Sequence, residues 1–156
     1  MTSLERPDLF DSVGLTPYVQ ATGGRGFHVV APLDATVDFD VVRPLATDLA
    51  DHLAAGQPDL LTAAQREQRR RGRIFLDVNR NAYGQTFVSP YSLRARDGAP
   101  VATPLGWSEL GRATPNGYDA AKIRRRLART DDPWATMGEH AASAAHARRE
   151  LDRIRS

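Results

Sequence analysis

The sequence contains no cysteine, a single lysine and no long apolar segment. Without cysteine, disulfide bonds and thiolate metal sites are excluded. No apolar run approaches the roughly 20 residues that a transmembrane helix requires, and nothing near Met1 resembles a signal peptide. We therefore expect a cytoplasmic protein without a membrane partner.

The basic residues are almost all arginine, because Lys122 is the only lysine among 21 Lys and Arg. The net charge is +2 and the isoelectric point is near 9.4. Arginine binds phosphate and carboxylate through paired hydrogen bonds, so the bias is compatible with a nucleotide partner. A GC-rich genome produces the same bias, and both explanations stay open. The length of 156 residues suffices for one domain with a hydrophobic core.

Hydrophobic patterning predicts an α+β fold, in which helices pack on one face of a small antiparallel sheet and a further helix ends the chain. Two short apolar segments flank a glycine-rich turn, which is typical of a β-hairpin. Asp38 has the side-chain type of a helix N-cap. The expected helices are residues 7–13, 38–56, 63–71, 118–128 and 133–156, with a tail at 138–156 that we expect to fray or to stay partly exposed. The expected strands are 16–21, 27–31, 73–78 and 86–95, followed by an extended segment at 101–104 and a helical turn at 107–110.

The turn at residues 22–26 has the sequence Thr-Gly-Gly-Arg-Gly, with three glycines in five positions. Glycine amides can approach a ligand closely, so Thr22, Gly24 and Arg25 could together hold a triphosphate. His28 follows on the adjacent strand and is a candidate for a phosphate contact. The alternatives are a hairpin turn that needs positive φ angles and a histidine of the core.

A run of arginines, which includes Arg70 and Arg73, leads into an apolar strand that ends at Asp77. Arg73 alternates with Ile74, so its side chain can lie on the same face as Asp77. Magnesium prefers carboxylate and phosphate oxygens, and Asp77 is therefore the best candidate for a metal ligand. The alternatives are a solvated arginine face and an aspartate that caps a turn.

Residues 89–96 add Arg94 and Arg96 on a further extended segment, which we expect beside the strand of Asp77. If Arg94 shares a face with Asp77, it adds a phosphate clamp. Arg80 and Asn81 follow Asp77 and could reach the same site. None of these patterns is specific by itself. The prediction of a polyphosphate site depends on the glycine turn, the strand of Asp77 and the segment of Arg94 lying close together.

Together these motifs resemble the polymerase domain of bacterial DNA ligase D, which belongs to the archaeo-eukaryotic primase superfamily. The resemblance runs from about Gly14 to Trp134. Residues 22–28 resemble the family's Ser-Gly-x-Lys-Gly-x-His motif, and residues 72–77 with Asn81 resemble its third-carboxylate motif. Residues 90–96 and 104–110 resemble the segment that follows, so four motifs occur in the family's order.

The resemblance implies an RRM-like, primase-palm sheet in a partial domain at residues 1–134, with a C-terminal helical extension at 135–156. It implies DNA repair by non-homologous end joining, with nucleotidyl transfer from an NTP or dNTP to a DNA 3′ end. Two Mg²⁺ or Mn²⁺ ions would support this chemistry. The implied partners are DNA ends, nucleoside triphosphates, a DNA ligase and a Ku-like protein, in a nucleoid-associated setting.

The resemblance also implies roles for single residues. Asp77 corresponds to the metal-binding carboxylate that completes the catalytic triad. The implied nucleotide-binding residues are Thr22, Gly24, Arg25, His28, Arg70 and Arg94. Thr22 replaces the family's serine and keeps the hydroxyl, whereas Arg25 replaces lysine and changes the geometry of the contact.

The family's Asp-x-Asp metal pair, which precedes the glycine turn, is missing from this sequence. Before Thr22 the only aspartates are Asp8 and Asp11, which are three positions apart. Asp38 and Asp40 have the right spacing but follow the turn, and we interpret them as helix capping. We therefore expect that the sequence matches the carboxyl-terminal half of the domain and begins inside the helix after that pair.

Three hypotheses follow for the function. The chain is half of an enzyme that a separate polypeptide completes, a non-catalytic module that binds nucleotide or DNA phosphates, or a truncated gene product. A single aspartate cannot hold two divalent ions against their mutual repulsion. We therefore expect the isolated chain to be inactive as a polymerase.

Overall fold

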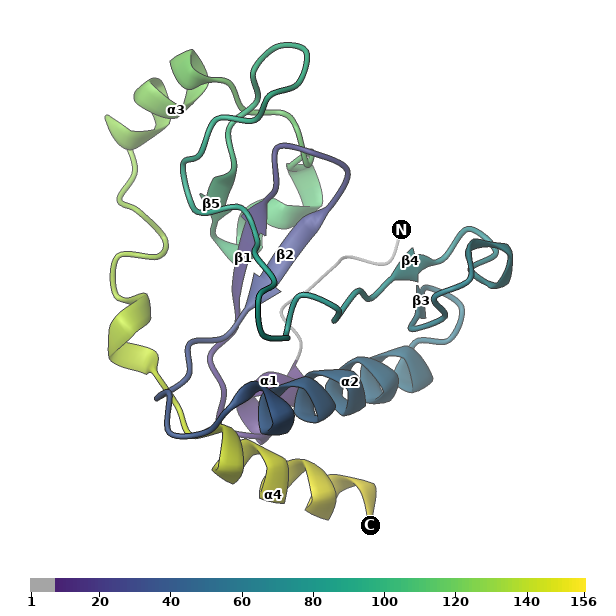
Figure 1. Ribbon diagram of the computed structural model, residues 1–156. Coiled ribbons are helices and arrows are strands. Elements are labelled where there is room, and N and C mark those ends of the chain that lie inside the picture. The colour runs from purple at the N-terminus through teal and green to yellow at the C-terminus, as the bar shows by residue number, and fades with distance from the viewer. Residues whose placement is uncertain (1–7) are drawn as a thin grey trace. The chain divides into compact units, whose positions relative to one another are not determined.

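The computed structural model describes residues 8–156, which fall into two compact units. The first unit contains Leu15–Pro32 and Val88–Ala141 and is called here the sheet unit. The second contains Leu33–Phe87 and Ala142–Ser156 and is called the helical unit. A short helix, α1 (Asp8–Ser12), precedes both (Figure 1). No helix of the described part of the chain is long and apolar enough to cross a membrane.

The sheet unit is built on a three-stranded antiparallel sheet in the order β2-β1-β5. The strands are β1 (Tyr18–Ala21), β2 (Phe27–Val30) and β5 (Thr103–Leu105). In the register, Ala21 lies opposite Phe27 on one side and Thr103 on the other. The predicted hairpin, the small antiparallel sheet and the α+β class are therefore confirmed.

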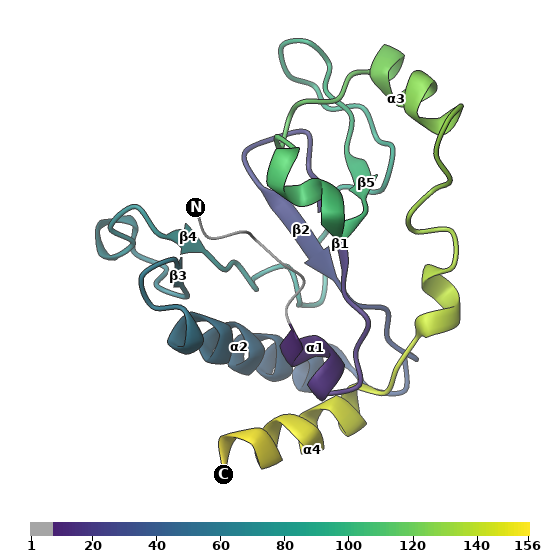
Figure 2. The same ribbon diagram turned by 180° about the vertical axis from the view of Figure 1, so that it is seen from behind.

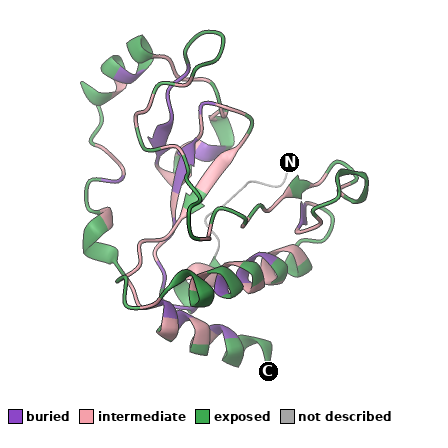
Figure 3. Ribbon diagram, viewed as in Figure 1, coloured by how far each residue is buried: buried purple, intermediate pink, exposed green. Residues whose placement is uncertain are grey.

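One face of this sheet packs against a 3₁₀ helix, Trp107–Arg112, which begins at the predicted helical turn. The buried side chains of Val19, Leu105 and Leu110 form the center of this core (Figure 3). The indole of Trp107 donates a hydrogen bond to the Pro17 carbonyl at 2.9 Å. Burial of aliphatic and aromatic groups thus fixes the helix on the sheet.

Two further segments complete the sheet unit. Helix α3 (Ala120–Leu127) lies within the predicted range and is capped by Asp119, whose carboxylate accepts from the Lys122 amide at 2.8 Å. A 3₁₀ helix, Met137–His140, follows. Between them, the buried Trp134 donates from its indole to the Val19 carbonyl at 3.2 Å and ties the segment to β1.

The helical unit contains α2 (Phe39–Gly56), α4 (Ala144–Arg155), β3 (Leu61–Thr62) and β4 (Ile74–Phe75). Helix α2 begins after Asp38, as predicted, although the Asp38 side chain makes no capping hydrogen bond. Leu45 and Leu49 of its predicted apolar face are buried. The face therefore serves as the core of this unit.

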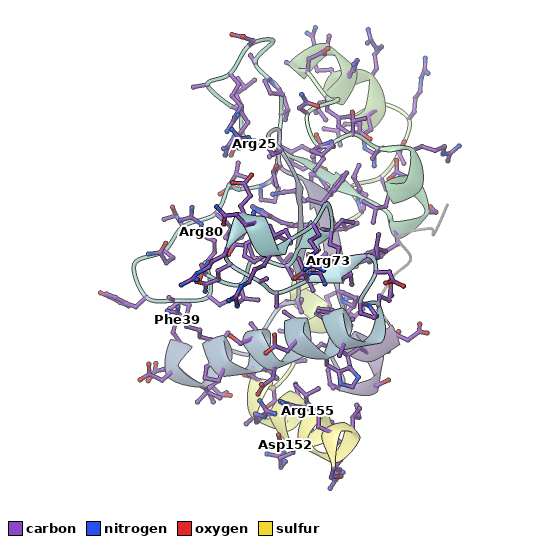
Figure 4. All side chains as sticks on the ribbon, turned by 90° about the vertical axis from the view of Figure 1, so that its right-hand side faces the viewer. Arg25, Phe39, Arg73, Arg80, Asp152 and Arg155 are labelled. Atoms are coloured by element: carbon purple, nitrogen blue, oxygen red, sulfur yellow. The ribbon has the colours of Figure 1, made fainter. Side chains whose placement is uncertain are left out.

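The C-terminal tail does not fray, whereas the alternative of partial exposure agrees with α4, in which Arg149, Arg153 and Arg155 are exposed. Ala144, Ala147 and Leu151 of α4 are fully buried, and α4 packs against α2. Two arginines of α4 converge on Asp48 of α2, Arg148 at 2.5 Å and Arg155 at 2.8 Å. Hydrogen bonding from Arg148 lowers the pKa of Asp48 below its ordinary value. Small alanines allow close approach of the two helices, and ion pairs flank the contact (Figure 4).

Two of the predicted strands differ from the structure. The strand expected at 73–78 is reduced to β4, which pairs parallel with β3, after Arg71 and Gly72 turn the chain with positive φ angles. The strand expected at 86–95 is absent, and this part of the chain contributes only an isolated bridge at Leu93. Proline removes a donor at position 90, and Tyr91 has a φ of 61°, which a strand does not allow.

The helix expected at 63–71 is reduced to one 3₁₀ turn, Glu67–Arg69. The Ala64 amide donates to the Thr62 hydroxyl, so residues 62–64 form a turn closed by a side chain and do not begin a helix. The helix expected from 133 begins only at Ala144.

Removal of the buried Leu151 side chain tests the docking of α4. Leu151→Ala should lower the free energy of unfolding by about 2–5 kcal/mol, because it leaves a cavity in a packed interface. Ile154→Ala is the matched control: its side chain is 42% exposed, and we expect a change within about 0.5 kcal/mol. Urea denaturation measures both. Equal, small losses in the two variants would mean that α4 is not packed.

Addition of a methyl group at Gly23 tests the hairpin turn. Gly23 has a φ of 67°, and a Cβ there would lie 2.6 Å from Cγ of Arg94. Gly23→Ala should therefore cost about 1–3 kcal/mol through backbone strain alone. Gly26→Ala is the control, since a Cβ at Gly26 meets nothing within 4 Å. The same urea titration compares the variants, and an unchanged midpoint for Gly23→Ala would contradict the close approach.

Candidate nucleotide-phosphate site

The glycine turn is held by its own hydrogen bonds. The Thr22 hydroxyl donates to the Gly26 carbonyl at 2.7 Å and accepts from the Gly24 amide at 3.2 Å. The hydroxyl and the amide predicted to face phosphate are therefore engaged within the turn. They fix its shape and leave Arg25 exposed at its tip (Figure 4).

Arginines of a neighbouring segment lie against this turn. The side chain of Arg94 passes over Gly23, and the guanidinium of Arg96 lies 3.9 Å from the position that a Cβ of Gly24 would take. An open hollow of about 490 Å³ is lined by residues 93–96. Neither arginine, nor Arg25, forms an ion pair with any residue of the described chain. Two arginines, Arg94 and Arg96, thus line the hollow without an ion-pair partner, and Arg25 is exposed on the adjoining turn.

The backbone of residues 91–102 explains why Arg94 lies there. The Tyr91 amide donates to the Ala102 carbonyl at 2.7 Å, and the Arg94 amide donates to the Pro100 carbonyl at 2.8 Å. The Gly23 amide in turn donates to the Pro115 carbonyl at 2.7 Å. Backbone hydrogen bonds therefore shape the arginine segment and anchor the turn, and the two meet at Gly23, where an added Cβ would lie 3.4 Å from the Pro100 carbonyl oxygen.

The remaining predicted residue of the sheet unit is His28. It lies on β2 opposite Gln20, two residues after the turn, and is half-buried. Gln20 is fully buried and donates from its side chain to the Val88 carbonyl at 2.9 Å. The assignment of His28 to phosphate stays a prediction.

A partly buried ion pair supports the same unit. Glu109 accepts from both terminal nitrogens of Arg126 and from the Gly106 amide. These bonds lower the pKa of Glu109, and the same pair raises the pKa of Arg126. Burial raises the pKa of Tyr91, with a further contribution from Asp132. Paired Arg–carboxylate contacts are strong and directional, so they anchor α3 to the end of β5.

The arginine run of the helical unit is engaged with its own backbone. The Arg70 guanidinium donates to the Gln65 carbonyl at 2.8 Å and lies 3.9 Å above the center of the Phe75 ring. Arg73 donates to three carbonyl groups, of Pro58, Arg69 and Arg70. These donors close the loop before β4, which is a structural role that the sequence did not suggest.

Asp77 is exposed, and its carboxylate accepts from the Asn79 amide at 3.0 Å. Among residues 8–156, no group of three His, Asp or Glu side chains could hold a metal ion. The geometry is that of a turn cap, and the described residues do not fit the two-ion site that the resemblance implies.

The structure thus divides the predicted site residues between the units. Thr22, Gly24, Arg25 and Arg94 meet at one place in the sheet unit, and His28 lies on the adjoining strand. Arg70 and Asp77 belong to the helical unit. The sequence-based prediction of nucleotide-binding residues did not include Arg96. Its position two residues after Arg94 could have indicated it. We call Thr22, Gly24, Arg25, Arg94 and Arg96 the turn–arginine site.

The family described as LigD, primase-polymerase domain, matches residues 2–134 of this chain. The chain is also similar to the multifunctional non-homologous end joining protein LigD of Pseudomonas aeruginosa, with 35% identity over 149 residues. That match covers 93% of this chain and 18% of the relative. The non-homologous end joining DNA repair protein LigD of Mycobacterium tuberculosis is 32% identical over 125 residues, which cover 80% of this chain and 16% of the relative.

A solved structure agrees with these sequence matches. The polymerase domain of M. tuberculosis ligase D in complex with DNA superimposes with a TM-score of 0.76 and 31% identity. The superposition covers 86% of this chain and 47% of that domain. The chain therefore spans less than a fifth of the length of these curated relatives and about half of the solved domain. Fold, motifs and sequence agree, and the chain belongs to the primase-polymerase family of ligase D.

Proposed function

We propose that the turn–arginine site binds the triphosphate of a nucleoside triphosphate, as part of DNA repair by non-homologous end joining. The observation that carries the proposal is the pair of arginines, Arg94 and Arg96, that line an open hollow against the glycine turn, which itself carries the exposed Arg25. None of the three forms an ion pair with a described acidic side chain. A polyphosphate would supply the missing negative charge.

The chemistry of the side chains suits phosphate. A guanidinium offers several N–H donors in a plane and binds two oxygens of one phosphate at once. Arg94 is half-buried, and its stem is held against Gly23, so less rotational freedom is lost on binding than for a free surface arginine. Arg25 and Arg96 are exposed and can adjust to the ligand. We propose that Arg94 orients the triphosphate and that Arg25 and Arg96 neutralise its charge.

Transfer of the nucleotide to a DNA 3′ end needs more than this site. The family's chemistry, by the resemblance, uses divalent ions, and no three acidic or histidine side chains of the described residues form a group that could hold one. We propose that carboxylates from outside these 156 residues complete the site, on a separate polypeptide. In that arrangement, this chain binds and orients the triphosphate, and a DNA ligase or a Ku-like protein is a candidate partner.

A non-catalytic role is the second candidate. It is favoured by the hydrogen bond of Asp77 to Asn79, which gives the carboxylate a structural use. In this case the chain would hold nucleotide or DNA phosphates without chemistry.

Loss of the Arg94 charge should weaken nucleotide binding. Arg94→Ala is expected to raise the Kd for ATP and dATP about tenfold, because one charge-assisted contact contributes about 1.5–3 kcal/mol and this one is half exposed. Arg94→Gln, which keeps the stem over Gly23, should have a similar effect. Isothermal titration calorimetry measures both Kd values.

The matched control is Arg149→Ala, an exposed arginine of α4 without an ion pair. It should leave the Kd unchanged although it removes the same charge. Equal affinities for wild type and both Arg94 variants, at unchanged thermal stability, would remove the turn–arginine site from consideration.

The chain alone should not extend a DNA primer. With Mn²⁺ and nucleoside triphosphates, we expect no product above background, because one exposed aspartate cannot position two divalent ions. Denaturing gel electrophoresis of a labelled primer detects the product. Addition of a separate polypeptide that carries the Asp-x-Asp strand of the family should produce extension, and Asp77→Asn should abolish it. Extension by the chain alone would contradict this prediction.

A further inference from the structure

Helix α3 exposes a group of cations that the turn–arginine site does not use. Three of its own residues and one just beyond it are exposed, and none pairs with a described acidic side chain. We call them the α3 cationic face: Lys122, Arg124, Arg125 and Arg129. Figure 3 shows α3 as exposed over most of its length.

The rest of the helix determines which way this face points. Ile123 is buried, and the guanidinium of Arg126 is bound to both oxygens of Glu109 and to the Pro104 carbonyl at 3.4 Å. At 3.6 residues per turn, Ile123 and Arg126 share one side of the helix. Arg124 and Arg125 therefore lie on the other side of the helix, whereas Lys122 lies at its edge, nearer to Arg126, and Arg129 follows the helix. The Glu109–Arg126 pair fixes the orientation of the helix.

Few acidic groups offset this charge. Within residues 113–130 the only acid is Asp119, whose carboxylate caps the helix and accepts from the Lys122 amide at 2.8 Å. Asp131 and Asp132 follow, and Asp132 accepts from the Trp134 amide at 2.9 Å. At neutral pH the surface of the helix is positive over both of its turns.

Hydrogen bonds connect α3 with the glycine turn inside the same unit. The Gly23 amide donates to the Pro115 carbonyl at 2.7 Å, and the Lys122 amine donates to the Gly117 carbonyl at 2.7 Å. Figures 1 and 2 show α3, the loop at 95–99 and the β1–β2 turn at the same end of the sheet unit. The turn–arginine site and the cationic face thus belong to segments at the same end of the sheet unit.

We propose that the α3 cationic face binds the phosphate backbone of duplex DNA. The inference builds on the proposed function, in which DNA is a partner, and adds a surface for it apart from the nucleotide hollow. Duplex DNA carries one charge per about 1.7 Å of its axis, so a row of arginines can neutralise several phosphates at once. Contacts of this kind position a protein on DNA without reading its sequence.

The composition of the face favours duplex DNA over other polyanions. Binding of single strands uses aromatic side chains on which bases stack, and α3 has none. A protein interface has an apolar center, whereas Leu127 is the only large apolar side chain exposed on α3. An acidic protein is therefore the less favoured occupant.

A triple variant tests the proposal in the complete chain. R124Q/R125Q/R129Q removes three exposed charges that make no packing contact in the core. The matched control, R43Q/R149Q/R153Q, removes three exposed charges from α2 and α4 and gives the same net charge. Fluorescence anisotropy with a labelled 24-base-pair blunt duplex, at several salt concentrations and with two unrelated sequences, measures the Kd.

We expect the α3 variant to bind both duplexes at least about tenfold more weakly than the control. The slope of log K against log salt should fall by about 0.9 for each lost phosphate contact. Its Kd for ATP should stay that of wild type, so a failure of this inference and a failure of the nucleotide site are distinguishable.

Three results would overturn the proposal. The first is an equal loss of affinity in both triple variants, which would indicate net charge alone. The second is an unchanged slope in the α3 variant. The third concerns competition for the labelled duplex. If polyglutamate of equal charge displaces it as strongly as unlabelled duplex does, an acidic protein is indicated as the occupant.

Discussion

The close approach of two backbone segments at Gly23 is the constraint on which the sheet unit depends. Because Gly23 has no side chain, the stem of Arg94 can pass over it, and its amide reaches the Pro115 carbonyl. The first contact places a guanidinium at the hollow. The second ties the hairpin to the loop that leads into α3. One small residue therefore positions both positively charged surfaces.

Paired charge has a different use in this protein from unpaired charge. Glu109 accepts from Arg126, and Asp48 accepts from Arg148 and Arg155. Each of these partly buried carboxylates joins two segments of the chain, so the residues of these pairs are committed to structure. The arginines around the hollow and on α3 have no such partner. The contrast separates the cations that build the fold from those available to a phosphate.

Local patterns predicted the elements that depend on nearby residues. The hairpin around the glycine turn, the apolar face of α2 and the helical turn at Trp107 are all confirmed. The strand expected at 86–95 failed because Tyr91 takes a positive φ, which hydrogen bonds to distant Ala102 stabilise. The tail expected to fray is packed because its small alanines meet α2, a contact between segments about 100 residues apart. Such long-range contacts leave little signal in a short window of sequence.

The candidate site shows the same limit. The sequence grouped the turn, Arg94 and Arg70 in one predicted site, and the structure brings only the turn and Arg94 into contact, so all three roles stay predictions. In the structure Arg70 donates to a backbone carbonyl and covers the Phe75 ring. An arginine run cannot reveal which of its members are needed to close a loop, because the carbonyls that accept from them are not encoded by residue type.

Recognition of phosphate and activation of a metal ion have different requirements. Phosphate binding needs donors held near one another, and the turn–arginine site has them within a single unit. Two-ion chemistry needs several carboxylates held against their mutual repulsion, and the described residues supply one, which caps a turn. The first requirement can be met without the second. Under the proposed function, binding and catalysis are separable: loss of Arg94 would act on affinity, whereas Asp77 would matter only when further carboxylates join it.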